Sequence, residues 1–216
     1  MNFKYIFITF ICGLLTSFFC KNYMYNKKWG NFAGEIPCFW CCLLGGIISG
    51  LVFFAFRYRF GWPQMLLHAA YFLPLVMIFF IDLRHKIIPD YLVIVLLFFG
   101  ILKICSNQAV KLILGGILGG GIFLLLALLS QGGLGGGDIK LAAVLGLWYG
   151  WREMLLVMFL AFTAGGLIAA FLLLLGVKKR KDTIPFAPFL VAAAFSVTMW
   201  GKEILQWYFR LSGLHF

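Results

Sequence analysis

The seven carboxylates of this 216-residue chain are the residues best suited to acid-base chemistry. Asp82 follows the unbroken apolar stretch 75–81, and Asp138 follows the stretch GGLGGG at 132–137. A carboxylate at or inside the edge of an apolar segment is costly unless it has a partner or a function. Two aspartates facing one polar cavity could hydrolyse a peptide bond, because an ionised carboxylate can deprotonate water while its protonated neighbour polarises the carbonyl. Such a pair titrates as one coupled system and needs neither a nucleophilic residue nor a metal.

The glycine-rich segment in front of Asp138 is expected to be unwound, because five glycines in six residues disfavour a helix. Unwound backbone at membrane depth is tolerated where it is buried in protein or lines a wet cavity. We therefore expect a short helix to start at Asp138. The backbone of a peptide substrate could approach Gly135 and Gly137 without a side-chain clash, so both glycines are candidate substrate-binding or loop residues.

The elements that position these acids must lie in lipid. The chain is 63% apolar and only 12% charged, whereas soluble domains carry about 25% charged residues. The formal net charge of +11 is typical of membrane topology signals and of contact with anionic lipids. This composition excludes a disordered chain and an ordinary soluble domain, and it does not favour binding to nucleic acid.

Apolar stretches between short polar breaks predict an all-α, polytopic membrane bundle of about eight helices in a single domain, 1–216. The predicted helices lie near 4–20, 38–56, 64–82, 89–104, 111–130, 139–150, 153–176 and 184–209. The sixth is too short for a full crossing unless it begins inside the membrane. Counting crossings puts the polar segments 82–90, 132–140 and 178–182 on one side. That side carries the basic run 178–181 together with Lys21, Lys27 and Lys28, which predicts that it is cytoplasmic.

Several residues near the two acids have more than one interpretation. Asp90 follows Pro89 where the fourth helix should begin, which is typical of an N-terminal cap, and a substrate-site role is the alternative. Lys140 is a candidate substrate-site residue, although snorkelling to the lipid interface is the simpler interpretation. Glycine pairs at 115–116 and 119–120, and at 45–46 with Gly50, predict close helix packing.

Two segments resemble the signature segments of the type IV prepilin peptidases, which are intramembrane aspartyl proteases of the Gly-x-Gly-Asp kind. They are IDLRHKIIPD at 81–90 and GGGDIKL at 135–141, and IPFAPF at 184–189 resembles the last-helix motif of that family. The resemblance covers 64–209 as the catalytic core and is weaker over 1–63. It implies that Asp82 and Asp138 are the catalytic pair. It also implies that the substrate is a pilin or pseudopilin precursor, whose short basic leader is removed at the cytoplasmic face of the cell membrane.

The larger bacterial members of this family carry two Cys-x-x-Cys pairs in a cytoplasmic loop associated with N-methylation. This chain has one such pair, CFWC at 38–41, and one pair does not supply the four thiolates of a structural zinc site. We therefore expect a short form without metal or other cofactor and without methyltransferase activity. A small ion- or proton-coupled transporter is the alternative function, since intramembrane acids and broken helices also build ion sites. The oligomeric state is left open.

Overall fold

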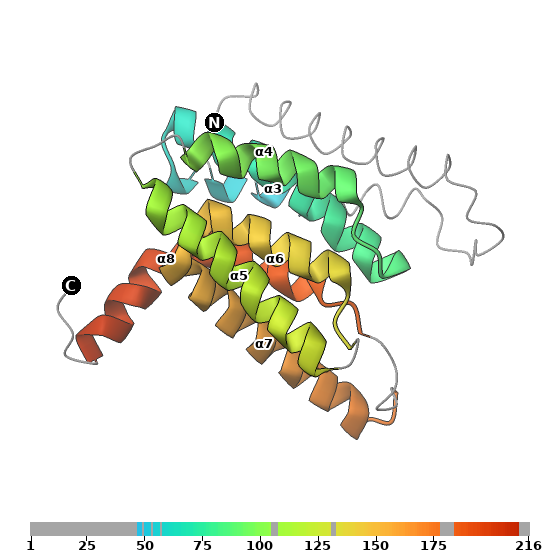
Figure 1. Cartoon of the computed structure of the whole chain (residues 1–216). Coiled ribbons are helices and arrows are strands. Elements are labelled where there is room, and N and C mark those ends of the chain that lie inside the picture. The colour runs from blue at the N-terminus through green and yellow to red at the C-terminus, as the bar shows by residue number, and fades with distance from the viewer. Residues whose placement is uncertain are drawn as a thin grey trace. The chain divides into compact units, whose positions relative to one another are not determined.

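The computed structural model describes residues 47–48, 50–52, 54–56, 58–104, 108–130, 133–177 and 184–211. Helices dominate the described part of the chain, and no strand occurs in it, so the all-α prediction is confirmed (Figure 1). The chain divides into two compact units, Met1–His85 and Lys86–Phe216.

The first unit contributes α3 (Trp62–His85) and the helical residues between 47 and 59. Aromatic rings pack between these two parts. Phe56 packs edge-on against Phe72 with a centroid separation of 5.0 Å. His68 stacks on Phe60 at 4.4 Å. α3 continues three residues beyond the predicted end at 82, and its last turn carries Arg84 and His85, which suit the negative end of a helix dipole.

The second unit holds five helices: α4 (Asp90–Ile104), α5 (Ala109–Leu129), α6 (Gly136–Tyr149), α7 (Trp151–Leu174) and α8 (Ala187–Leu211). The short α6 packs against α4, α5, α7 and α8, and it is therefore the central helix of this unit (Figure 1). Its 14 residues come to about 21 Å, which is less than the hydrocarbon thickness of a bilayer. The predicted shortness of this helix is confirmed.

Glycines allow α5 and α6 to approach each other at backbone distance. A Cβ added to Gly115 would lie 2.3 Å from the carbonyl oxygen of Gly146, and a Cβ added to Gly146 would lie 2.0 Å from the carbonyl oxygen of Gly115. One helical turn further along α5, a Cβ on Gly119 would lie 2.5 Å from the Ala142 carbonyl oxygen. The prediction that the glycine pairs of this helix serve close packing is confirmed. Gly50 has open space around it, and residues 45–46 lie outside the described residues.

α6 is also joined to α8 by a buried polar contact. The Tyr149 hydroxyl donates to the Ala194 carbonyl oxygen at 2.7 Å and lies 2.6 Å from the Thr198 hydroxyl. Tyr149 is 8% exposed, so these contacts satisfy a hydroxyl that has little access to water.

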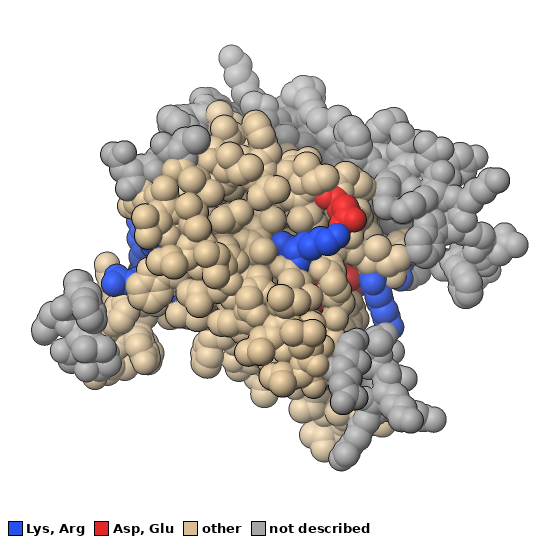
Figure 2. Space-filling model, in the orientation of Figure 1, with Lys and Arg blue, Asp and Glu red and all other residues tan. Residues whose placement is uncertain are grey.

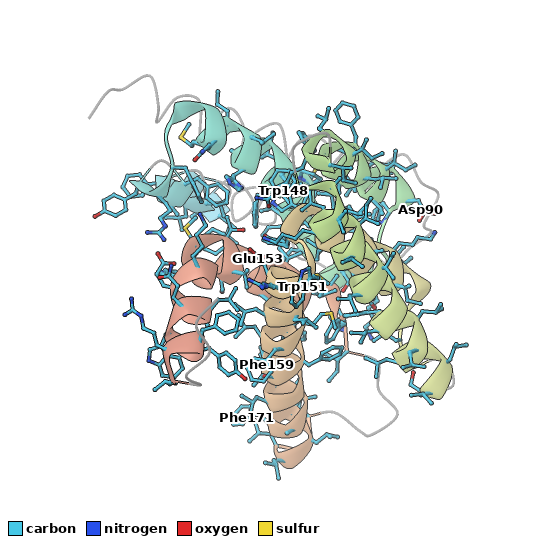
Figure 3. The ribbon with its side chains drawn as sticks, turned by 60° about the vertical axis from the view of Figure 1, so that its left-hand side comes forward. Asp90, Trp148, Trp151, Glu153, Phe159 and Phe171 are labelled. Carbon is cyan, nitrogen blue, oxygen red and sulfur yellow. The ribbon has the colours of Figure 1, made fainter. Side chains whose placement is uncertain are left out.

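Four described helices are long and apolar enough to cross a membrane: Gln64–His85, Ala109–Leu129, Trp151–Leu174 and Ala187–Leu211. Large apolar side chains such as Phe159 and Phe171 point outward along α7, where they are 66% and 60% exposed (Figure 3). On the face drawn in Figure 2, the described surface is largely uncharged. This is a surface for lipid, and the chain is a multi-pass membrane protein.

Several helix boundaries differ from the predicted ones by two or three residues, among them the starts of α6 and α8. α6 begins at Gly136 and not at Asp138, because Gly135 adopts an extended conformation (φ −71°, ψ 143°) and the two glycines after it are already helical. α8 begins at Ala187 and not at 184, where the Phe186 carbonyl accepts the amides of Phe189 and Leu190 at 3.0 and 3.3 Å. The predicted helix near 4–20, the basic run 178–181 and the Cys-x-x-Cys pair lie outside the described residues.

Candidate active site

Asp82 lies in the last turn of α3, directly after the apolar residues that bury this helix. Its side chain is 5% exposed, and in the described part of the chain no other charged residue is buried. Ile78 and Ile81 beside it in the sequence are 0% and 2% exposed. A buried acid at the end of an apolar helix is therefore a site where function is expected.

Asp138 occupies the first turn of α6, two residues after its start. Its backbone amide donates to the Gly135 carbonyl at 3.1 Å, which closes the first turn. The side chain folds back over Gly135, since a Cβ placed on that glycine would lie 3.3 Å from Oδ2 of Asp138. The first turn of a helix stabilises negative charge, and the missing side chain at Gly135 leaves room for the carboxylate.

Two contacts join the first turn of α6 to the start of α4. Gly137 packs on Ile88 so closely that a Cβ on the glycine would lie 2.9 Å from the Cβ of Ile88. Lys140 forms an ion pair with Asp90, in which Nζ lies 2.7 Å from Oδ1. Asp90 is the first residue of α4, and the amides of the next turn bond to the Pro89 carbonyl.

The structure thus brings five of the six predicted site residues together in the second unit: Gly135, Gly137, Asp138, Lys140 and Asp90. Asp82 belongs to the first unit. The contact with Ile88 and the ion pair between Asp90 and Lys140 were not predicted. Partners 50 residues apart leave no local pattern, and the only sequence signal was the presence of opposite charges near the two acids.

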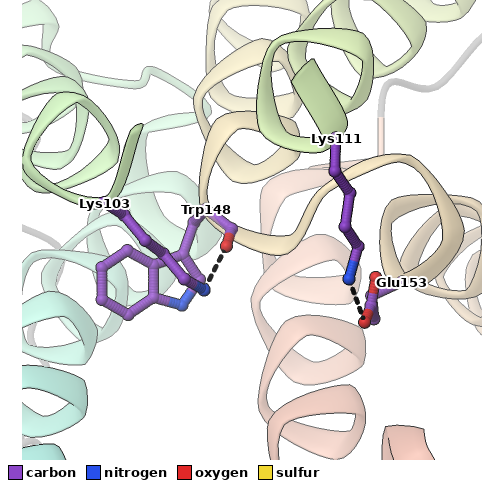
Figure 4. A network of polar contacts seen from close by, with 4 residues as sticks. All are labelled: Lys103, Lys111, Trp148 and Glu153. Carbon is purple, nitrogen blue, oxygen red and sulfur yellow. Dashed lines mark hydrogen bonds and ion pairs between the residues drawn. The ribbon is translucent and has the colours of Figure 1, made fainter. Parts of the chain in front are cut away.

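A second polar group lies at the other end of α6. Lys103 of α4 donates to the Trp148 carbonyl oxygen, and its ammonium stands 4.5 Å from the centroid of the Trp148 ring (Figure 4). Lys111 of α5 pairs with Glu153 of α7 at 2.9 Å (Figure 4). These contacts hold the carboxyl end of α6 and the start of α7, about 15 Å along the helix from Asp138.

Comparison with known proteins identifies the segment that carries both aspartates. The profile of the type IV leader peptidase family matches residues 69–170. The leader peptidase HopD of Escherichia coli is 36% identical over 131 residues, which are 56% of this chain and 84% of that protein. No solved structure gives a significant match.

Longer relatives match over more residues of the chain. The prepilin leader peptidase/N-methyltransferase of Legionella pneumophila is 31% identical over 160 residues, which are 70% of this chain and 56% of the relative. The protein of the same name from Pseudomonas aeruginosa is 30% identical over 181 residues, which are 79% of this chain and 61% of the relative. The chain therefore spans somewhat more than half the length of these relatives. The matches to the family profile and to the HopD peptidase show that the chain belongs to the type IV leader peptidase family.

Proposed function

We propose that the chain is an intramembrane aspartyl endopeptidase that removes the leader of type IV prepilins or pseudopilins. The observation that carries the proposal is the pair of acids inside the family-matched segment 69–170. Asp82 is buried at the end of α3, and Asp138 lies in the first turn of α6 beside a glycine without a side chain. The names of the matched relatives support the substrate class.

In the proposed reaction, Asp82 and Asp138 act as one pair. Such a pair titrates as one coupled system, in which one carboxyl is ionised while the other keeps its proton. The ionised carboxylate would take a proton from water, and the protonated one would polarise the scissile carbonyl and then protonate the leaving amine.

The extended backbone at Gly135 suits an incoming peptide. Gly133 and Leu134 precede it and are likewise not helical, so this segment offers backbone groups with few side chains around them. A precursor could lie along it with its scissile bond near Asp138. We further propose that this end of the second unit faces the cytoplasm, on the strength of the basic residues at 178–181 and at 21, 27 and 28.

The test is cleavage of a model prepilin by the purified chain in detergent, with the cut located by mass spectrometry. The proposal predicts one cut between the basic leader and the apolar helix. It also predicts that the new amino terminus carries no methyl group when a methyl donor is supplied. The proposal would be overturned in favour of a transporter if the chain left several leaders intact and liposomes containing it showed ion flux.

A further inference from the structure

The turn that carries Asp138 is poorly anchored by its own residues. Three glycines, 135–137, directly precede Asp138, so this segment has no side chains that could anchor it. Glycine loses more backbone entropy on ordering than any other residue. A carboxylate that must be placed within a fraction of an ångström therefore needs support from outside the turn.

That support comes from the start of α4, on both sides of Asp138. On the amino-terminal side, Gly137 packs on Ile88, and on the carboxyl-terminal side, Lys140 pairs with Asp90 at 2.7 Å. The residues that receive these contacts flank Pro89, whose ring fixes its backbone φ angle. Two short contacts thus join a glycine-rich turn to a turn that proline restrains.

We infer that Asp90 and Lys140 are a positioning ion pair that holds the Asp138 turn of α6 against the start of α4. The inference rests on the proposed function, because it assigns a task to the surroundings of the proposed catalytic acid. Figure 3 labels Asp90 at the start of α4, well apart from Trp148 and Glu153. The side chains of Lys140 and Asp90 are 57% and 68% exposed, so the pair adds orientation to the turn and contributes little to the stability of the fold.

The obvious competing role is that Asp90 binds the basic leader of the substrate. The two roles make different kinetic predictions. A positioning pair acts on the geometry of Asp138, so its loss lowers kcat to the same extent for every substrate. A leader-binding carboxylate acts on the substrate charge, so its loss raises KM for a basic leader and has no effect on KM for a neutral one.

The experiment compares the parent chain with Lys140→Met, Asp90→Asn, Lys140→Arg and the exchanged pair Asp90→Lys with Lys140→Asp. Each is assayed on a model prepilin with a basic leader and on the same precursor with its leader charges neutralised. We expect kcat to fall by about two- to fivefold in the two single neutral variants, as for an exposed ion pair. Lys140→Arg should keep the parent rate, and the exchanged pair should recover at least half of the loss on a logarithmic scale.

Lys202→Met removes an exposed lysine from α8 and should leave the kinetics unchanged. Amide hydrogen exchange over 135–140 should become faster in the two neutral variants and return towards the parent rate in the exchanged pair. A rise of KM confined to the basic leader, or an exchanged pair no better than the single variants, would overturn this inference alone. A parent chain that cleaves neither precursor would overturn the proposed function, and the inference with it.

Discussion

The contact between α5 and α6 gives the sharpest stability prediction, for the substitution Gly146→Ala. A Cβ at this position would lie 2.0 Å from the Gly115 carbonyl oxygen and 2.4 Å from its carbonyl carbon. Both atoms belong to the backbone of a helix, so no side chain can turn away to make room. Carbon and oxygen atoms of such groups normally stay about 3.3 Å apart or more, so the two helices must separate by about 1 Å.

The magnitude follows from two opposing effects. Overpacking a well-packed interface typically costs about 1–3 kcal/mol, while replacing glycine by alanine inside a helix contributes about 0.8–1 kcal/mol in favour of folding. Gly121→Ala supplies the matched control, because Gly121 lies in α5 with nothing within 4 Å of an added Cβ. Gly146→Ala should therefore be less stable than Gly121→Ala by about 1–3 kcal/mol, since both variants receive the same helix-forming contribution.

The same substitution should affect catalysis from a distance. Asp138 lies eight residues before Gly146 in α6, and a helix of this length transmits a displacement of its far end. A shift of about 1 Å in the carboxylate costs up to 100-fold in rate. Stability is measured by unfolding in mixed micelles with increasing sodium dodecyl sulfate, and activity by prepilin cleavage. If Gly146→Ala matches Gly121→Ala in both measurements, the close approach of α5 and α6 is refuted.

Three other substitutions test separate contacts. Gly135→Ala places a Cβ 3.3 Å from Oδ2 of Asp138, so the cleavage rate should fall. Gly136→Ala is the control and should keep the parent rate, because no atom lies within 4 Å of a Cβ added there. Equal rates in the two variants would contradict the close approach of the carboxylate to Gly135. Lys111→Met removes the ion-pair partner of Glu153, whose side chain is only 23% exposed. The free energy of unfolding should therefore fall by about 1 kcal/mol or more. It should recover in the double variant Lys111→Met with Glu153→Leu, because no unpaired carboxylate is then left in the interface. An unrecovered double variant would indicate that Lys111 acts through packing alone. Tyr149→Phe leaves the Ala194 carbonyl without its Tyr149 donor and should cost about 1–2 kcal/mol in detergent unfolding, whereas no change would mean that the hydroxyl contact contributes nothing.

The sequence predicted the helical elements well where apolar stretches have clear ends. The predicted helix at 89–104 differs by one residue from α4, Asp90–Ile104. It also predicted the close packing of the glycine pairs in α5, because small residues four apart line one face of a helix. We did not predict the partner of that face, which is Ala142 and Gly146 of α6, although these two small residues are also four apart.

The predicted start of α6 was wrong for a reason that local propensity does not contain. The low helix propensity of glycine predicted that Gly136 and Gly137 would be unwound, yet both are helical. Tertiary packing, with Gly137 against Ile88, outweighs a propensity cost of about 1 kcal/mol per glycine. The ion pair between Asp90 and Lys140 joins residues 50 positions apart. Such a contact depends on how α4 and α6 pack, which local patterns do not contain.

We propose that Asp82 and Asp138 together perform the hydrolysis. The most direct measurement compares the prepilin cleavage rates of the parent, Asp82→Asn and Asp138→Asn, with unfolding in mixed micelles to confirm that each variant is folded. The amide keeps the shape of the side chain and removes its ionisable proton. Each variant should lose activity by about 100-fold or more, as expected for a general acid or base. A folded variant of either position that still cleaves at close to the parent rate would contradict the claim.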